Sequence, residues 1–106
     1  MKSECRRYVQ TVIAAYIALP HTPNHASRSD RQLAAELYAR GIPLSLINAA
    51  FLLGTARRLR RSPPPVRSLH YFLPVIEEIL PNVPPPSYIR YLEMKIRLLL
   101  PSVGAR

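Results

Sequence analysis

The chain has little glycine, a single cysteine, no tryptophan and few acidic residues. Its 106 residues include 3 Gly, 1 Cys and 6 Asp+Glu against 15 Lys+Arg, giving a formal net charge of +9. Scarce glycine and few β-branched runs argue against a β-sandwich and a dinucleotide-binding α/β fold. One cysteine excludes an internal disulfide. A hydrophobic fraction of 48% nevertheless permits a packed core.

Long apolar runs are also missing. The most apolar window, residues 42–54, is shorter than the ~20 residues that a helix needs to cross a hydrocarbon core of ~30 Å. No secretory signal pattern is present near the N-terminus. We therefore expect a cytoplasmic protein with a reduced thiol and no membrane partner.

Apolar residues recur at helical spacing between prolines, of which there are 12. This pattern predicts an all-α fold in a single domain over residues 1–106, a compact bundle of about five helices. The expected helices cover residues 4–19, 29–40, 43–61, 68–80 and 87–100.

Turn and capping residues set the expected helix ends. Ser29 with Gln32 has the spacing of a capping box, and Gly41 suits the left-handed position after a helix. Pro74 either kinks the fourth helix or divides it into a short turn and a second helix. Ser87 is the expected N-cap of the last helix, which Pro101 closes.

Residues 37–76 contain no acidic side chain, and six arginines give this segment a charge of +6. Helical geometry places Arg57, Arg60 and Arg61 within about 100° of one another, with Arg58 pointing elsewhere. Such a cluster can bind a phosphate backbone, although cations also favour a helix C-terminus through the helix dipole. The expected phosphate-binding residues are Arg40, Arg57, Arg58, Arg60, Arg61 and Arg67.

The segment around the turn at residues 39–44 has the spacing of a helix-turn-helix. Ser45 and Asn48 then lie at the start of the would-be recognition helix. However, Leu37 stands where a small residue is usual, and the following helix is very apolar for a DNA groove. A structural helical hairpin is the alternative interpretation.

The segment 66–72 combines a cation with aromatic residues, as in proteins that stack bases on rings. Its leucine, valine and isoleucine spacing also fits a core helix. Arg67, His70 and Tyr71 are the residues expected to point outward.

Candidate metal and catalytic residues are sparse. Adjacent Glu77 and Glu78 diverge by about 100° on a helix and form no facing acid/base pair, so we expect a solvated patch. The potential zinc ligands lack close pairs, and Cys5 has the position of a buried residue. We expect no metal, no cofactor and no enzymatic activity. The potential ligands are Cys5, His21, His25 and His70.

The stretch that runs from SRSDR at 27–31 through GIPL at 41–44, followed by RR at 57–58 and RSLHYFLPVIEE at 67–78, covers most of the chain. It resembles small uncharacterised bacterial proteins that are loosely associated with mobile elements and replication genes. The resemblance implies a compact bacterial domain and no particular activity or binding residue.

Together these patterns predict a basic helical protein that binds DNA or RNA chiefly through phosphate contacts. The alternative is an interaction or assembly subunit, or a homodimer. Tyr88, Tyr91 and Met94 favour this alternative because they lie outside the apolar stripe of the last helix.

Overall fold

The computed structural model describes residues 3–61 and 64–99, and this part of the chain is helical with no strand. The all-α prediction is confirmed. Pro101, expected to close the last helix, lies outside the described residues. The elements are α1 (Ser3–Ile17), α2 (Arg28–Ala39), α3 (Leu44–Leu59), the 3₁₀ turn η1 (Leu69–Phe72), α4 (Leu73–Ile79) and α5 (Pro86–Leu99).

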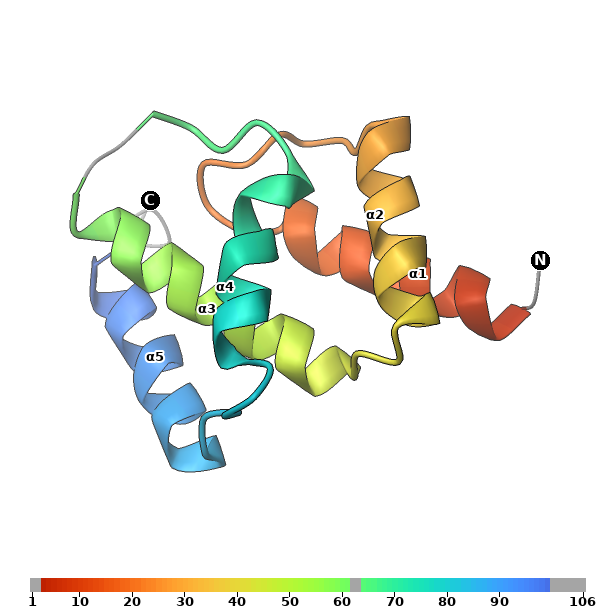
Figure 1. Cartoon of the computed structure of the whole chain (residues 1–106). Helices are drawn as coiled ribbons and strands as arrows, with labels where there is room; N and C mark the ends of the chain where they lie inside the picture. The colour runs from red at the N-terminus through yellow and green to blue at the C-terminus, as the bar shows by residue number, and fades with distance from the viewer. Residues whose placement is uncertain (1–2, 62–63, 100–106) are drawn as a thin grey trace.

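Helix α3 runs through the middle of the molecule. Figure 1 shows α4 lying across it and α5 against its C-terminal half, while α1 and α2 pair with each other on the other side. The first half of α3 is apolar on nearly every face, and the neighbouring helices bury most of it. Its burial positions the arginine-rich end of α3 at one edge of the molecule.

Three aromatic rings form the centre of the core. Tyr16, Phe51 and Phe72 are at most 1% exposed, with ring centroids 5.1 to 6.5 Å apart. Gly54 lets α3 approach this cluster, because a Cβ there would lie 2.8 Å from the ring of Phe72. α3 and the 3₁₀ turn therefore pack with almost no space between them.

The start of α2 differs from the prediction. Its N-cap is Ser27 and not Ser29: the Ser27 hydroxyl accepts from the Asp30 backbone N–H, and the Asp30 carboxylate accepts from the Ser27 N–H. Asp30 is only 2% exposed, and its other oxygen accepts the backbone N–H of Leu69 at 2.9 Å. One buried carboxylate thus ties the start of α2 to the start of η1.

Other predicted helix ends agree with the structure more closely. Gly41 has a φ of 73°, the left-handed conformation expected after α2. Pro74 divides the fourth segment into η1 and α4, one of the two predicted outcomes. The start of α5 is an exception: the helix begins at Pro86, so Ser87 lies inside it and is not its N-cap.

In the described part of the chain, no helix is long and apolar enough to span a membrane.

Candidate nucleic-acid interface

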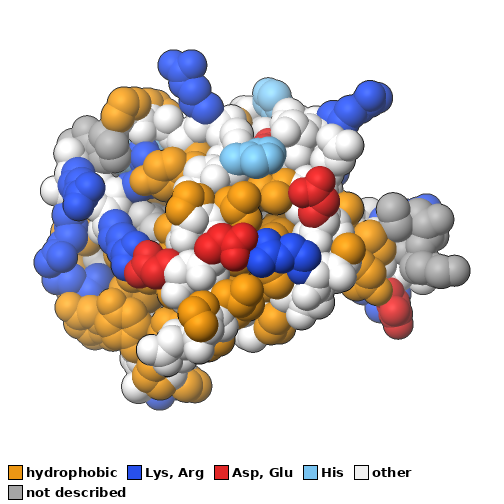
Figure 2. All heavy atoms as spheres, in the orientation of Figure 1, with side chains coloured by type: hydrophobic (Ala, Val, Ile, Leu, Met, Phe, Trp, Pro, Cys, Tyr) orange, Lys and Arg blue, Asp and Glu red, His pale blue; other side chains and the backbone are white. Residues whose placement is uncertain are grey.

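The end of α3 leaves the core with its arginines on different faces. Arg57, Arg60 and Arg61 are exposed, as their angular spacing predicts, whereas Arg58 is 5% exposed. Figure 2 shows basic side chains gathered at the edge where α3 ends, with hydrophobic side chains beside them over α5. This edge is the candidate interface.

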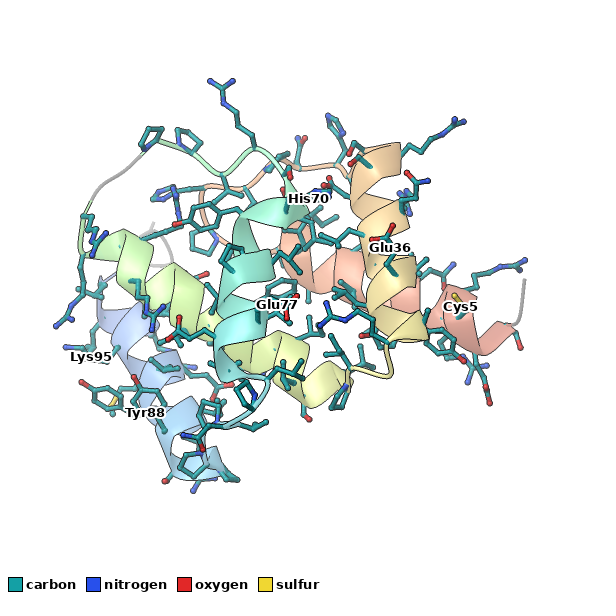
Figure 3. All side chains as sticks on the ribbon, in the orientation of Figure 1. Cys5, Glu36, His70, Glu77, Tyr88 and Lys95 are labelled. Atoms are coloured by element: carbon teal, nitrogen blue, oxygen red, sulfur yellow. The ribbon has the colours of Figure 1, made fainter. Side chains whose placement is uncertain are left out.

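Two arginines of the predicted set are held in ion pairs by neighbouring glutamates of α4. Arg40 makes two hydrogen bonds to Glu77 at 2.8 and 3.0 Å, and Arg57 makes two to Glu78 at 2.8 and 2.6 Å. Because they accept these bonds, the pKa values of both glutamates lie below their ordinary value. The predicted solvated patch is therefore exposed but paired, and Figure 3 shows Glu77 projecting from α4.

Arg58 is used inside the protein. Its guanidinium donates to the carbonyl oxygen of Pro64 and lies 5.1 Å from the ring centroid of Tyr71. A buried guanidinium with these contacts holds Pro64 close to the end of α3 and packs against the Tyr71 ring. In this structure the Arg58 side chain is not presented to an external phosphate.

The segment after α3 presents the three polar or aromatic side chains expected to point outward. Arg67 and His70 are exposed, and Tyr71 is 43% exposed. The Ser68 hydroxyl caps η1 by accepting the His70 backbone N–H at 2.9 Å. The backbone N–H of Val66 donates to the backbone carbonyl oxygen of His21 at 2.8 Å, which anchors this segment to the α1–α2 loop.

Arg60 and Arg61 differ from Arg57 in having no ion pair with any residue that the structure describes, and the same holds for Arg67. They lie on successive parts of the same edge. Arg60 faces α5, Arg61 lines the groove beside Tyr71, and Arg67 lines the next groove along. The three charges are available to an external anion without breaking an internal contact.

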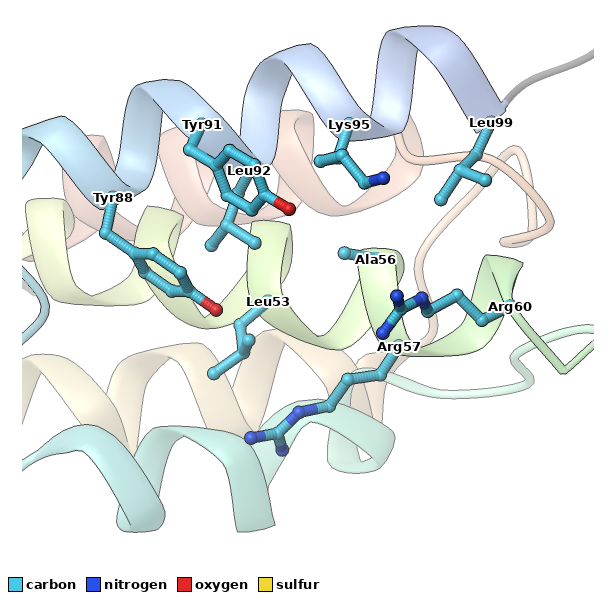
Figure 4. Close-up of a pocket in the computed structure, with 9 residues that line it drawn as sticks. All are labelled: Leu53, Ala56, Arg57, Arg60, Tyr88, Tyr91, Leu92, Lys95 and Leu99. Carbon is cyan, nitrogen blue, oxygen red and sulfur yellow. The ribbon is translucent and has the colours of Figure 1, made fainter.

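A groove of about 220 Å³ separates the end of α3 from α5. Figure 4 shows basic side chains of α3 on one side of it and α5 side chains on the other. The pair Tyr88 and Tyr91 is stacked, with ring centroids 5.9 Å apart and an interplanar angle of 25°. The groove is lined by Leu53, Ala56, Arg57, Arg60, Tyr88, Tyr91, Leu92, Lys95 and Leu99.

Sequence reasoning did not place Tyr88, Tyr91 and Lys95 in the candidate interface. The signal was present, because positions 88, 91 and 95 are spaced by three and four residues and share one face of a helix. What the sequence did not show was that this face would lie beside the arginines of α3. Figure 3 shows Tyr88 and Lys95 on α5, at the opposite end of the molecule from Cys5.

The helix-turn-helix residues lie away from this groove. Ser45 and Asn48 are exposed on the first half of α3, next to a shallow apolar groove against α1. α2 packs mainly on α1, and α3 packs mainly on α5 and α4. A helix-turn-helix role for these residues stays a prediction.

The described residues offer little support for a metal site or a reactive thiol. In residues 3–61 and 64–99, no three His, Cys, Asp or Glu side chains are grouped so that they could hold a metal ion. Cys5 is buried at 7% exposure, in the position that its helical spacing predicts.

No protein-family profile, curated protein or solved structure matches the chain.

Proposed function

We propose that this chain is a small nucleic-acid-binding protein that acts mainly through phosphate contacts from the edge where α3 ends. The observation that carries the proposal is the set Arg60, Arg61 and Arg67, exposed along one edge with no ion pair in the described part of the chain. Lys95 adds a fourth cation across the α3–α5 groove. DNA and RNA phosphates are the common polymeric anions that such an edge fits.

The other predicted residues take graded roles in this proposal. Arg57 and Arg40 contribute only where a phosphate exchanges with the glutamate that now holds each of them. Arg58 acts indirectly, by supporting Tyr71. His70 lies at the border of the edge, and Ser45 and Asn48 belong to it only if the nucleic acid extends along α3. The proposal assigns no catalytic residue. Its setting in a mobile element or a replication system rests on the sequence resemblance alone.

The salt dependence of binding tests this function. For wild-type protein, the logarithm of the association constant should fall linearly with the logarithm of salt concentration, because phosphate contacts release counterions. The triple variant Arg60→Gln, Arg61→Gln, Arg67→Gln should reduce the magnitude of that slope by about two to three, one contact per arginine. Thermal unfolding should hardly change, since the three side chains are exposed and carry no ion pair.

A charge-matched control comes from the other end of the molecule. Arg6, Arg28 and Arg31 are also exposed and line a groove between α1 and α2. Changing these three to Gln removes the same net charge and should leave the slope nearly unchanged. Equal losses in both triple variants would mean that net charge, and not the α3 edge, governs binding. No salt-sensitive association with any duplex or single strand would refute the function.

An interaction or assembly subunit is the second candidate, and α5 is the observation that favours it. Leu92 is its one buried residue among those described, whereas Met94 is 52% and Leu98 is 72% exposed. An apolar face of this kind is typical of a protein–protein contact. Sedimentation at micromolar concentration tests it: a concentration-dependent dimer that binds no nucleic acid would favour this candidate over the first.

A further inference from the structure

The α3–α5 groove combines two kinds of chemistry, and the phosphate contacts use only one of them. Arg60 and Lys95 supply charge, but Tyr88 and Tyr91 supply exposed aromatic surface, 39% and 46% exposed respectively. Neither ring is in the core that α5 shares with α3. We propose that these two tyrosines stack on unpaired bases, so that the site prefers single-stranded nucleic acid over duplex. This inference rests on the proposed nucleic-acid function.

The two rings already have the geometry of a stacking platform. Tyr88 and Tyr91 lie one helical turn apart, with centroids at 5.9 Å and planes inclined by 25°. The two rings are therefore close to parallel and side by side, and both are exposed to solvent. Aromatic side chains beside a cationic groove are the common feature of single-strand binders, because every base has a flat face that can stack on a ring.

The groove is small for a site that encloses a whole small molecule, and one base of a longer chain needs no more space than it offers. Its volume is about 220 Å³, below the range of about 300–1,000 Å³ typical of sites that enclose a drug-sized ligand. A base lying on a tyrosine, with its phosphate beside Arg60 or Lys95, needs no deep cavity.

A duplex does not satisfy the tyrosines in the same way. The faces of paired bases are stacked on one another, so a side chain reaches them only after unstacking, which costs free energy. A duplex can still use the arginines through its phosphates. The tyrosines should therefore raise single-strand affinity selectively and leave duplex affinity unchanged.

A second ring extends the same edge. Tyr71 lines a groove with Arg57 and Arg61 on the other side of α3, and Arg57 lines both grooves. A strand that stacks on Tyr91 and passes over Arg57 meets Tyr71 next. The end of α3 thus stands as a basic ridge between two aromatic surfaces, an alternation of charge and rings that suits a flexible single strand.

The test compares labelled oligothymidylate and oligouridylate with a duplex of equal length by fluorescence anisotropy. The double variant Tyr88→Leu, Tyr91→Leu keeps apolar bulk and helix propensity but removes both rings. It should lower affinity for both single strands by about 5- to 150-fold for each stacked base lost, with no change for the duplex. The matched control Tyr88→Phe, Tyr91→Phe keeps the rings and should bind as the wild type does.

Several results would overturn the proposal. If the leucine variant binds single strands as tightly as the wild type, the rings do not stack on bases, whereas the phosphate-contact function survives through the duplex data. If the leucine variant instead loses a concentration-dependent dimer, the face is a contact between copies of the chain. If wild-type protein binds neither strand nor duplex, the proposed function fails together with this inference.

Discussion

The buried Asp30 carboxylate joins the start of α2 to the turn that carries Tyr71, and Asp30→Ala tests this connection. The carboxylate accepts two backbone N–H groups, those of Ser27 at 3.0 Å and Leu69 at 2.9 Å. A hydrogen bond to a charged group contributes about 1.5–3 kcal/mol, and its removal also leaves the buried Leu69 N–H without a partner. We expect Asp30→Ala to lower the free energy of unfolding by about 3–5 kcal/mol.

Urea unfolding followed by far-ultraviolet circular dichroism measures this loss. Ser27→Ala is the matched control, because it removes only the hydroxyl that accepts the Asp30 N–H and should cost about 1 kcal/mol. Asp30→Ala removes the acceptor of both the Ser27 and the Leu69 N–H groups, so it should cost more than Ser27→Ala, which leaves the contact with the start of η1 in place. If Asp30→Ala is no less stable than Ser27→Ala, the carboxylate does not hold the two segments together and the reasoning is wrong.

Three further predictions concern packing and titration. Gly54→Ala should destabilise the protein by about 1–3 kcal/mol in urea unfolding, because the new methyl group overlaps the Phe72 ring; a gain in stability would mean that the ring moves freely. Burial, and secondarily the charge of Asp30, raises the pKa of Tyr16 to about 12. Because the folded protein keeps this proton to a higher pH than the unfolded chain does, the free energy of unfolding should keep its full value below pH ~10 and fall between about pH 10 and 12. This fall should be smaller in alkaline melts of Tyr16→Phe, and the part that remains belongs to tyrosines such as Tyr8, whose pKa burial also raises. At pH ~7 the variant should be neutral or stabilising because the buried hydroxyl has no partner among the described residues; a marked loss at neutral pH would contradict this. Arg58→Met should lower the free energy of unfolding by about 1–3 kcal/mol, because it removes a buried charged hydrogen bond. An unchanged melting temperature would show that Arg58 is dispensable to the fold.

Local signals in the sequence are enough to predict where the helices lie, but they predict the helix ends less well. Apolar periodicity and Gly41 predicted α1 to α3 closely, because both depend on residues a few positions apart. The N-cap of α2 was predicted wrongly because Ser27 with Asp30 and Ser29 with Gln32 offer the same spacing. Only the tertiary use of Asp30 by η1 distinguishes them, and that contact spans 39 positions.

The sequence predicts that the candidate interface is basic, but it does not predict which of its arginines form internal contacts. The exposed positions of Arg57, Arg60 and Arg61 follow from helical angles alone. The pairing of Arg57 with Glu78 and the burial of Arg58 under Tyr71 depend on how α4 and η1 cross α3, which no local pattern encodes. For the same reason the groove between α3 and α5 was missed.

Mapping of amide chemical shifts during titration with a short oligothymidylate tests the central claim most directly. Binding at the edge where α3 ends should shift amides in residues 57–61, 67–71 and 88–95. Amides in residues 6–10 and 28–35, around the control groove, should move little. Shifts concentrated on α1 and α2, or small shifts spread evenly over the chain, would contradict the assignment of the nucleic-acid interface to the end of α3.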